Sequence, residues 1–296
     1  MRLRVYHTTR YLYPQPARES HNELRLMPRS DDDQTCLDFR LSITPQARIF
    51  AYDLPSGRVH HFNYRPPHNT LTIQAEALVV THRSDPFYFL QLTTEDRAFY
   101  QLEGVRQRYA EFLAPTPRVP LVEDADRIAA IARRQAGAST ASFLISLTRA
   151  LYRVITYTPG ATHVNTSLQQ VLEKRQGVCQ DFAHLMLAVC RRQGIPARYI
   201  SGYLYTGQRH EETEAHLTAE LPAPLVSGDA MHAWVECLMP DERWCGFDPT
   251  NNLLANDHYI KVHYGRDYND VAPVRGVYHG PAEHTLEVSV RVVREA

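Results

Sequence analysis

Cys179 stands where a thiol could act as a nucleophile, at the predicted start of an amphipathic helix. Apolar residues follow it at the spacing of one buried helical stripe, and Gly194 and Pro196 end the pattern. In the first turn of a helix, unpaired backbone N–H groups and the helix dipole favour a thiolate and could bind an oxyanion. Gly177, two residues earlier, is predicted to leave room for a substrate carbonyl.

His232 and Asp248 lie on a predicted β-hairpin that could complete a catalytic triad with Cys179. The alternating residues 231–239 predict one strand, and residues 243–248 predict a second after a polar turn. In an antiparallel pair of even register the two side chains share a face and lie diagonally opposite. An imidazole that is oriented by a carboxylate suits general base catalysis near neutral pH.

Each of these residues alone is explained as well by structure as by catalysis. A cysteine in a helix is often a small buried hydrophobe, and a histidine in a strand is often a hydrogen-bonded core residue. Asp248, which precedes a proline, could simply open an Asx-type turn. The coincidence of all three residue types in a compatible arrangement favours catalysis.

The other four cysteines show no catalytic pattern. Cys190 is predicted to be buried in the helix core, and Cys36 lies in the N-terminal half. In the even register of the hairpin, Cys237 and Cys245 face each other as buried thiols, with a reversible disulfide or half of a metal site as alternatives. No cysteine spacing matches a zinc pattern, so no metal is expected.

Composition excludes several classes of protein. Lys and Arg number 32 against 33 for Asp and Glu, so no net field attracts nucleic acid, and we expect no nucleic-acid partner. The N-terminus shows no apolar run of signal-peptide length, and no long apolar stretch predicts a membrane span. Five cysteines without a Cys-x-x-Cys pair suit a reducing compartment, so a cytoplasmic location is expected. The oligomeric state is left open.

The chain is predicted to be an α+β protein with an N-terminal antiparallel β-domain that resembles a sandwich. Short alternating segments and turn residues indicate that the β-domain spans residues 1–115. A proline-rich connector precedes a catalytic core at 121–280, in which residues 124–135 and 141–155 have helical spacing. Residues 281–296 are predicted to form a strand that could return to the β-domain. The polar segment 207–229 could act as a lid.

Two aromatic residues are the nearest candidates to wall a substrate cleft. Trp234 lies on the same predicted strand as His232, and Tyr203 ends the strand before it. Large aromatic side chains are, however, more often part of a core than of a cleft. We therefore name both as substrate-binding candidates, beside the alternative that they are packed inside.

Four sequence blocks resemble the transglutaminase-like superfamily. They are Arg175–His184, Gly194–Tyr203, His232–Glu236 and Gly246–Thr250, and they present cysteine, histidine and aspartate in the family's order. Two further blocks, His21–Pro28 and Gly265–Asp270, resemble the bacterial subgroup that carries an N-terminal β-domain. The resemblance implies a papain-like α+β core that acts on amides, with Cys179, His232 and Asp248 as its triad.

The expected activity is hydrolysis of a peptide or protein amide through a thioester on Cys179. His232 would transfer the proton, and no metal or organic cofactor is required. The first alternative is transfer of the acyl group to an amine, as in cross-linking or amide ligation. The second is a catalytically silent binding module, because the superfamily also contains inactive members.

Overall fold

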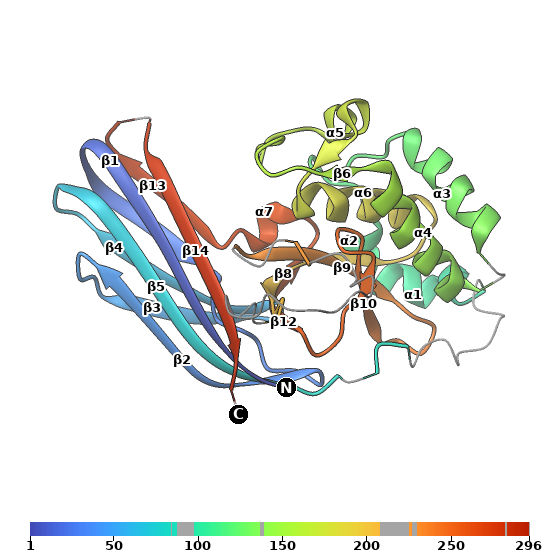
Figure 1. The fold of residues 1–296 in the computed structure, drawn as a ribbon, viewed down its shortest axis with the longest axis horizontal. Helices are drawn as coiled ribbons and strands as arrows, with labels where there is room; N and C mark the ends of the chain where they lie inside the picture. The colour runs from blue at the N-terminus through green and yellow to red at the C-terminus, as the bar shows by residue number, and fades with distance from the viewer. Residues whose placement is uncertain are drawn as a thin grey trace, which may run out of the picture.

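The computed structural model describes residues 1–83, 85–87, 98–136, 139–207, 225–226, 230–281 and 283–295. A curled antiparallel β-domain lies beside an α+β core in which helices cover one sheet (Figure 1). The α+β class expected from the sequence is therefore confirmed. No helix in the described part of the chain is long and apolar enough to cross a bilayer.

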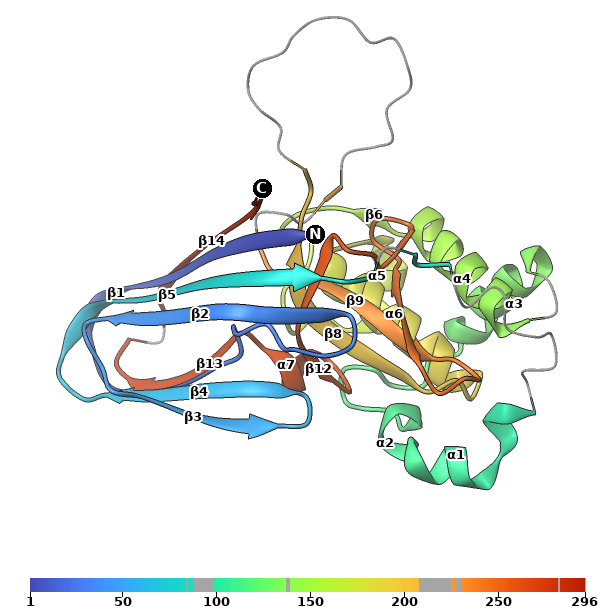
Figure 2. The ribbon, with the colours of Figure 1, turned by 90° about the horizontal axis from the view of Figure 1, so that it is seen from below.

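Seven strands form the sheet of the β-domain around one long central strand (Figure 2). They are β1 (Arg2–Leu24), β2 (Gln34–Thr44), β3 (Ile49–Leu54), β4 (Gly57–Tyr64), β5 (His68–Thr81), β13 (Val274–His279) and β14 (Thr285–Arg294). The first half of β1 pairs with β5 and β14, and its second half pairs with β4 and β13. The two layers expected of a sandwich are thus two halves of one curled sheet.

The core contains a second antiparallel sheet, in the order β11-β10-β9-β8-β12. Its strands are β8 (Ala197–Leu204), β9 (His232–Leu238), β10 (Trp244–Asp248), β11 (Leu253–Leu254) and β12 (Tyr259–Gly265). Two short parallel strands, β6 (Thr156–Tyr157) and β7 (Gln176–Gly177), pair before the central helix. Every residue of β8 and β9 is buried, as expected for strands that are covered on both faces.

The helices of the core surround one central helix, α6. They are η2 (Phe99–Gln101), α1 (Glu103–Arg108), α2 (Ala110–Leu113), α3 (Asp124–Gln135), α4 (Thr140–Val154), α5 (Leu168–Lys174), α6 (Cys179–Arg192) and α7 (Tyr268–Val271). The predicted helices at 124–135 and 141–155 match α3 and α4. Twelve of the residues of α6 are buried, because α3, α4 and α5 cover it on one side and β8 and β9 on the other.

Contacts in the structure cross both domain boundaries that the sequence predicts. Residues 103–113 were assigned to the β-domain, but α2 packs against α6 and β8 of the core, where Phe112 meets the ring of Trp244 at 5.3 Å. The strand β13 lies within the expected core range of 121–280, yet it pairs with β1. The C-terminal strand β14 also lies along β1, from Leu3 opposite Arg294 onwards. Both ends of the chain therefore build the β-domain.

An apolar cluster and a polar network join the two domains at β12. Ile260 and Val262 of β12 are fully buried against Leu3 and Val79 of the β-domain. The side chain of Gln34 reaches the same strand, where its amide accepts from the N–H of Lys261 at 2.7 Å and donates to the carbonyl of Lys261 at 2.8 Å. The edge of the core sheet is thus covered by the β-domain.

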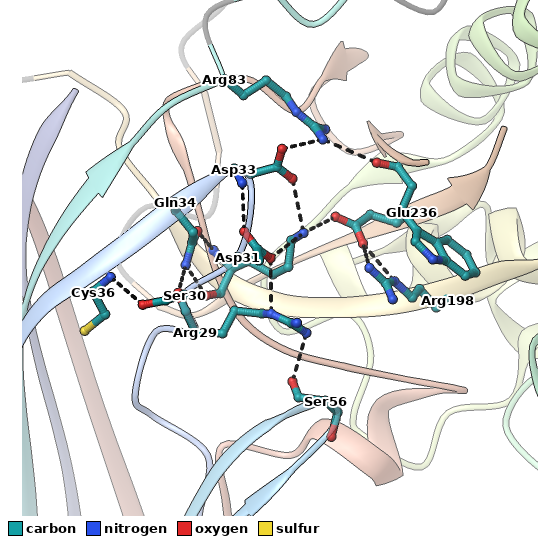
Figure 3. Close-up of polar contacts among 12 residues, drawn as sticks. Arg29, Ser30, Asp31, Asp33, Gln34, Cys36, Ser56, Arg83, Arg198 and Glu236 are labelled. Carbon is teal, nitrogen blue, oxygen red and sulfur yellow. Dashed lines mark hydrogen bonds and ion pairs between the residues drawn. The ribbon is translucent and has the colours of Figure 1, made fainter. Parts of the chain in front are cut away.

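Charged residues from both domains meet beside this contact (Figure 3). Lys261 Nζ lies 2.6 Å from Glu236 of the core and 3.2 Å and 3.4 Å from Asp31 and Asp33 of the β-domain. Arg198 also binds Glu236, at 2.6 Å. Burial would raise the pKa of Glu236, but the charges of Lys261 and Arg198 outweigh it and lower the pKa to about 2. Glu236 is therefore ionised and compensated by two cations.

Replacing Lys261 with Met is expected to destabilise the folded chain by about 3–5 kcal/mol, because Glu236, Asp31 and Asp33 then lose their shared buried cation. The measurement is the free energy of unfolding in urea. Arg40→Met is the control, since Arg40 forms an exposed pair with Asp38 at 3.2 Å, and its loss should change stability by less than about 1 kcal/mol. Equal effects of the two substitutions would contradict the role assigned to the network.

Candidate active site

Cys179 is the first residue of α6, as the sequence predicts, and its position is fixed by a capped helix start. The carboxylate of Asp181 accepts from the backbone N–H of Val178 at 2.8 Å and from the hydroxyl of Thr162 at 2.6 Å. Burial raises the pKa of Asp181, while these two hydrogen bonds oppose the rise. The cap orients the first turn, in which backbone N–H groups have no intrahelical acceptor.

Gly177 serves this cap rather than the substrate. A Cβ atom at Gly177 would lie 2.8 Å from both Cβ and Oδ2 of Asp181, so only glycine allows the aspartate to fold back over the helix start. Gly177 is buried and is not part of the cavity lining. The prediction that it leaves room for a substrate carbonyl is therefore corrected: it leaves room for Asp181.

The hairpin of β9 and β10 has the predicted even register. Cys245 lies opposite Cys237, and Phe247 lies opposite Val235. This register brings the first residue of β9 and the last residue of β10 together, and Nε2 of His232 lies 2.8 Å from Oδ2 of Asp248. Both side chains are buried, so water does not screen the contact.

Four further hydrogen bonds satisfy the carboxylate of Asp248. Its Oδ2 accepts from the hydroxyl of Tyr259 and from the side-chain amide of Asn251, each at 2.8 Å. Its Oδ1 accepts from the backbone N–H groups of Thr250 and Asn251, at 2.9 and 3.2 Å, which is an Asx-type turn. Burial would raise the pKa of Asp248, but His232, Asn251 and Tyr259 lower it. The Asx turn and the contact with His232 thus coexist.

Tyr259 and Asn251 are members of the site that were missed from the sequence. Asn251 stands three residues after Asp248, and this short spacing is a signal that could have revealed it. Tyr259 belongs to β12, which pairs with β8 on the far side of β9 from Asp248. Only the three-dimensional fold brings the phenol to the carboxylate.

His232 links this carboxylate to Cys179. Because Asp248 occupies Nε2, Nδ1 is the ring nitrogen that remains for the thiol. Burial would lower the pKa of His232, but the charge and hydrogen bond of Asp248, followed by those of Cys179, raise it to about 10. A protonated imidazole beside Cys179 stabilises the thiolate form. The three predicted triad residues are thus brought together.

A cavity of about 400 Å³ opens beside Cys179 and His232, and both domains line it. The residues of the core that line it include Tyr157, Val178, Gln180, Tyr199, Met231 and Tyr268. The residues of the β-domain that line it include His7, Thr9, Tyr11, Val274, Leu286 and Val288. The contribution of the β-domain had no sequence signal, because these residues are distant in the chain.

Trp234 and Tyr203 do not wall this cavity, and the prediction that they do is corrected. Trp234 is 2% exposed and packs beneath the site, where its ring meets that of Tyr259 at 5.3 Å. Tyr203 is fully buried at the domain interface, where its hydroxyl donates to the carbonyl of Leu26 at 3.2 Å. Both residues are therefore part of the core, the alternative that the sequence left open.

Cys237 and Cys245 are buried thiols of the core, as the sequence predicts, and Sγ of Cys237 lies 3.7 Å from Sγ of Cys190. Within the described ranges, no cluster of three or more His, Cys, Asp or Glu residues could hold a metal ion. The expected lid at 207–229 falls almost wholly outside the described residues.

Replacing Asp248 with Asn is expected to lower the pKa of His232 by about 1–3 units, because the buried negative charge that stabilises the imidazolium is lost. NMR titration of nitrogen-labelled histidine measures this change. Tyr259→Phe is the control, since it removes a hydrogen bond from Asp248 but keeps the charge, so the pKa of His232 should stay well above 6.5. An unchanged pKa in the Asn variant would show that Asp248 does not stabilise the imidazolium.

Comparisons with known proteins show which sequences and folds this chain resembles. Two family models match, the Transglutaminase-like superfamily over residues 129–249 and the Bacterial transglutaminase-like N-terminal region over residues 3–80. An uncharacterized protein of Mycobacterium leprae is 37% identical over 297 residues, which cover 100% of this chain and 99% of that protein. A Protein-glutamine gamma-glutamyltransferase of Pseudomonas aeruginosa is 33% identical over 95 residues, 32% of this chain and 13% of that protein.

A solved structure shares the whole fold. The crystal structure of a proposed cysteine protease from Cytophaga hutchinsonii superposes with a TM-score of 0.73 at 24% sequence identity. The match covers 100% of this chain and 92% of that chain, so both domains and their arrangement are common to the two proteins. Together with the two family models, which cover the β-domain and the core separately, it confirms the resemblance seen in the sequence. The chain therefore belongs to the transglutaminase-like superfamily, in the bacterial group that carries this N-terminal region.

Proposed function

We propose that the chain is a cysteine-dependent amide hydrolase that acts through a thioester on Cys179. The observation that carries the proposal is the buried contact of 2.8 Å between His232 and Asp248, together with the raised pKa of His232, to which Cys179 contributes. Cys179 at the helix start is thus an activated nucleophile, and the imidazolium of His232, which Asp248 holds in place, is its proton donor.

In the proposed first step, Sγ of Cys179 attacks the carbonyl carbon of a peptide or protein amide. The C=O electron pair moves to oxygen, and N–H groups of the first turn of α6 supply hydrogen bonds to the resulting oxyanion. The intermediate collapses as Nδ1 of His232 gives its proton to the departing amine, which leaves a thioester and a neutral imidazole. Asp248 keeps the ring in the orientation that this transfer needs.

In the proposed second step, the neutral imidazole of His232 accepts a proton from water as the water oxygen attacks the thioester. The tetrahedral intermediate expels the thiolate of Cys179, and the carboxylic acid product leaves. The imidazolium and the thiolate are thereby restored. No step requires a metal ion or an organic cofactor.

Acyl transfer to an amine is the second candidate. It uses the same thioester and differs only in the acceptor, and the named activity of the Pseudomonas aeruginosa relative favours it. Water is present at high concentration and therefore accepts most of the acyl group, unless a binding site for the amine excludes it. We therefore place hydrolysis first.

Alkylation of Cys179 by iodoacetamide is expected to show an inflection well below pH 8.5, the value of an ordinary thiol. His232→Ala should move the inflection upwards, because the stabilising imidazolium is lost. Intact-protein mass spectrometry, with Cys179→Ala to assign the reactive site, provides the measurement. Cys36 is an internal control, since burial and then Asp38 raise its pKa to about 11, so it should stay unmodified at neutral pH.

An ordinary thiol profile for Cys179 that does not change in His232→Ala would contradict the activation. It would favour the remaining alternative, a catalytically silent binding module. In that case Cys179→Ser would change no measurable property of the chain other than its alkylation.

Product analysis distinguishes hydrolysis from transfer. Incubation of the chain with a library of amide-capped peptides should yield free acids, whose masses identify cleavage by water. Added methylamine should give less than about a tenth of the product as methylamide if the chain lacks a site that excludes water. Predominant methylamide would reverse the order of the two candidates, and Cys179→Ala should abolish both products.

A further inference from the structure

The cavity beside Cys179 has a wall that the β-domain contributes. His7, Thr9 and Tyr11 alternate along β1 and so share one face of its sheet. The paired strand β14 places Val288 opposite Thr9 and Leu286 opposite Tyr11, on the same face. The wall, which we call the β-wall, therefore consists of these five residues.

The β-wall carries no charge. None of the described residues that line the cavity is Asp, Glu, Lys or Arg. Both ring nitrogens of His7 are engaged, Nδ1 with the hydroxyl of Tyr203 at 3.1 Å and Nε2 with the hydroxyl of Thr9 at 2.9 Å. Burial lowers the pKa of His7 to about 4, so the ring is neutral at physiological pH.

The apolar residues of β14 are unusually exposed for a strand that faces another domain. Leu286 is 50% exposed and Val288 is 43% exposed, although both line the cavity. On the opposite face of the same strand stand Glu287, which pairs with Arg10 at 3.7 Å, and Ser289. The apolar face is thus directed towards the cavity that holds the nucleophile, where a bound group would cover it.

We infer that the β-wall is a binding subsite for a large uncharged apolar side chain on the acyl part of the substrate. The inference deepens the proposed function, and it rests on Cys179 being the nucleophile of that cavity. An aliphatic or aromatic side chain would remove the exposed surfaces of Leu286 and Val288 from water. A carboxylate or an ammonium group seated on the β-wall would lose its hydration without gaining a partner of opposite charge among its five residues.

Alkylation by three matched probes tests the subsite. The probes are N-acetylated aminoacyl chloromethyl ketones with a Leu, Asp or Lys side chain, in which the thiolate displaces chloride and forms a thioether. The rate constant of each probe at Cys179, divided by that of iodoacetamide, separates recognition from intrinsic reactivity. The Leu probe is expected to exceed both charged probes by about tenfold or more in this ratio.

A charge placed on the β-wall should change this order. Val288→Glu is expected to reduce the ratio of the Leu probe severalfold and to raise that of the Lys probe, because a carboxylate then faces the cavity. Ser289→Glu is the matched control, since it adds the same charge to the opposite face of the edge strand β14, and it should leave all three ratios unchanged. Thermal unfolding checks that both variants fold.

Equal ratios for the three probes, or equal effects of Val288→Glu and Ser289→Glu, would overturn the subsite. A failure of the proposed function gives a different result. In that case the iodoacetamide rate itself would be that of an ordinary thiol, while the ratios would still report which side chain the β-wall accepts.

Discussion

The ion pair between His232 and Asp248 is the interaction on which the rest of the site depends. A carboxylate that is fully buried is stable as an anion only if donors surround it, and Tyr259, Asn251 and Thr250 provide them. The resulting charge holds the imidazole protonated despite its burial. That proton in turn favours the thiolate of Cys179. Removal of water from the pair makes each of these effects stronger than it would be at the surface.

Much of this site could be predicted from the sequence, because its geometry follows from local periodicity. The stripe of apolar residues placed Cys179 at a helix start, and the two-residue repeat of a strand restricted His232 and Asp248 to an even register. The substrate-binding predictions failed for a physical reason. The residue type at position 234 shows that the side chain is large and apolar. It does not show whether the fold places Trp234 below a cavity or in its wall. Gly177 likewise has a role only because Asp181 folds back.

The fold was predictable in class but less so in its boundaries. Alternating segments indicated an antiparallel β-domain, yet its central strand β1 is completed by β13 and β14, which come after the core in the sequence. Such pairs join residues 250 or more positions apart, and no local pattern encodes them. The pairing of β1 with β14 also creates the β-wall, and the strand order of the core sheet brings Tyr259 to Asp248. Sequence blocks therefore identified the candidate catalytic residues, whereas the surroundings of those residues required the structure.

Three successive residues of the edge strand β12 make three different structural contacts. Tyr259 donates to Asp248, Ile260 fills the apolar cluster between the domains, and Lys261 neutralises carboxylates of both domains. Successive residues of a strand point to opposite faces, so inserting or deleting one residue here would reverse all three assignments at once. The strand should therefore resist changes in length much more than changes in composition during divergence. A core that is separated from its β-domain would also expose this strand, which supports the contact between Asp248 and His232.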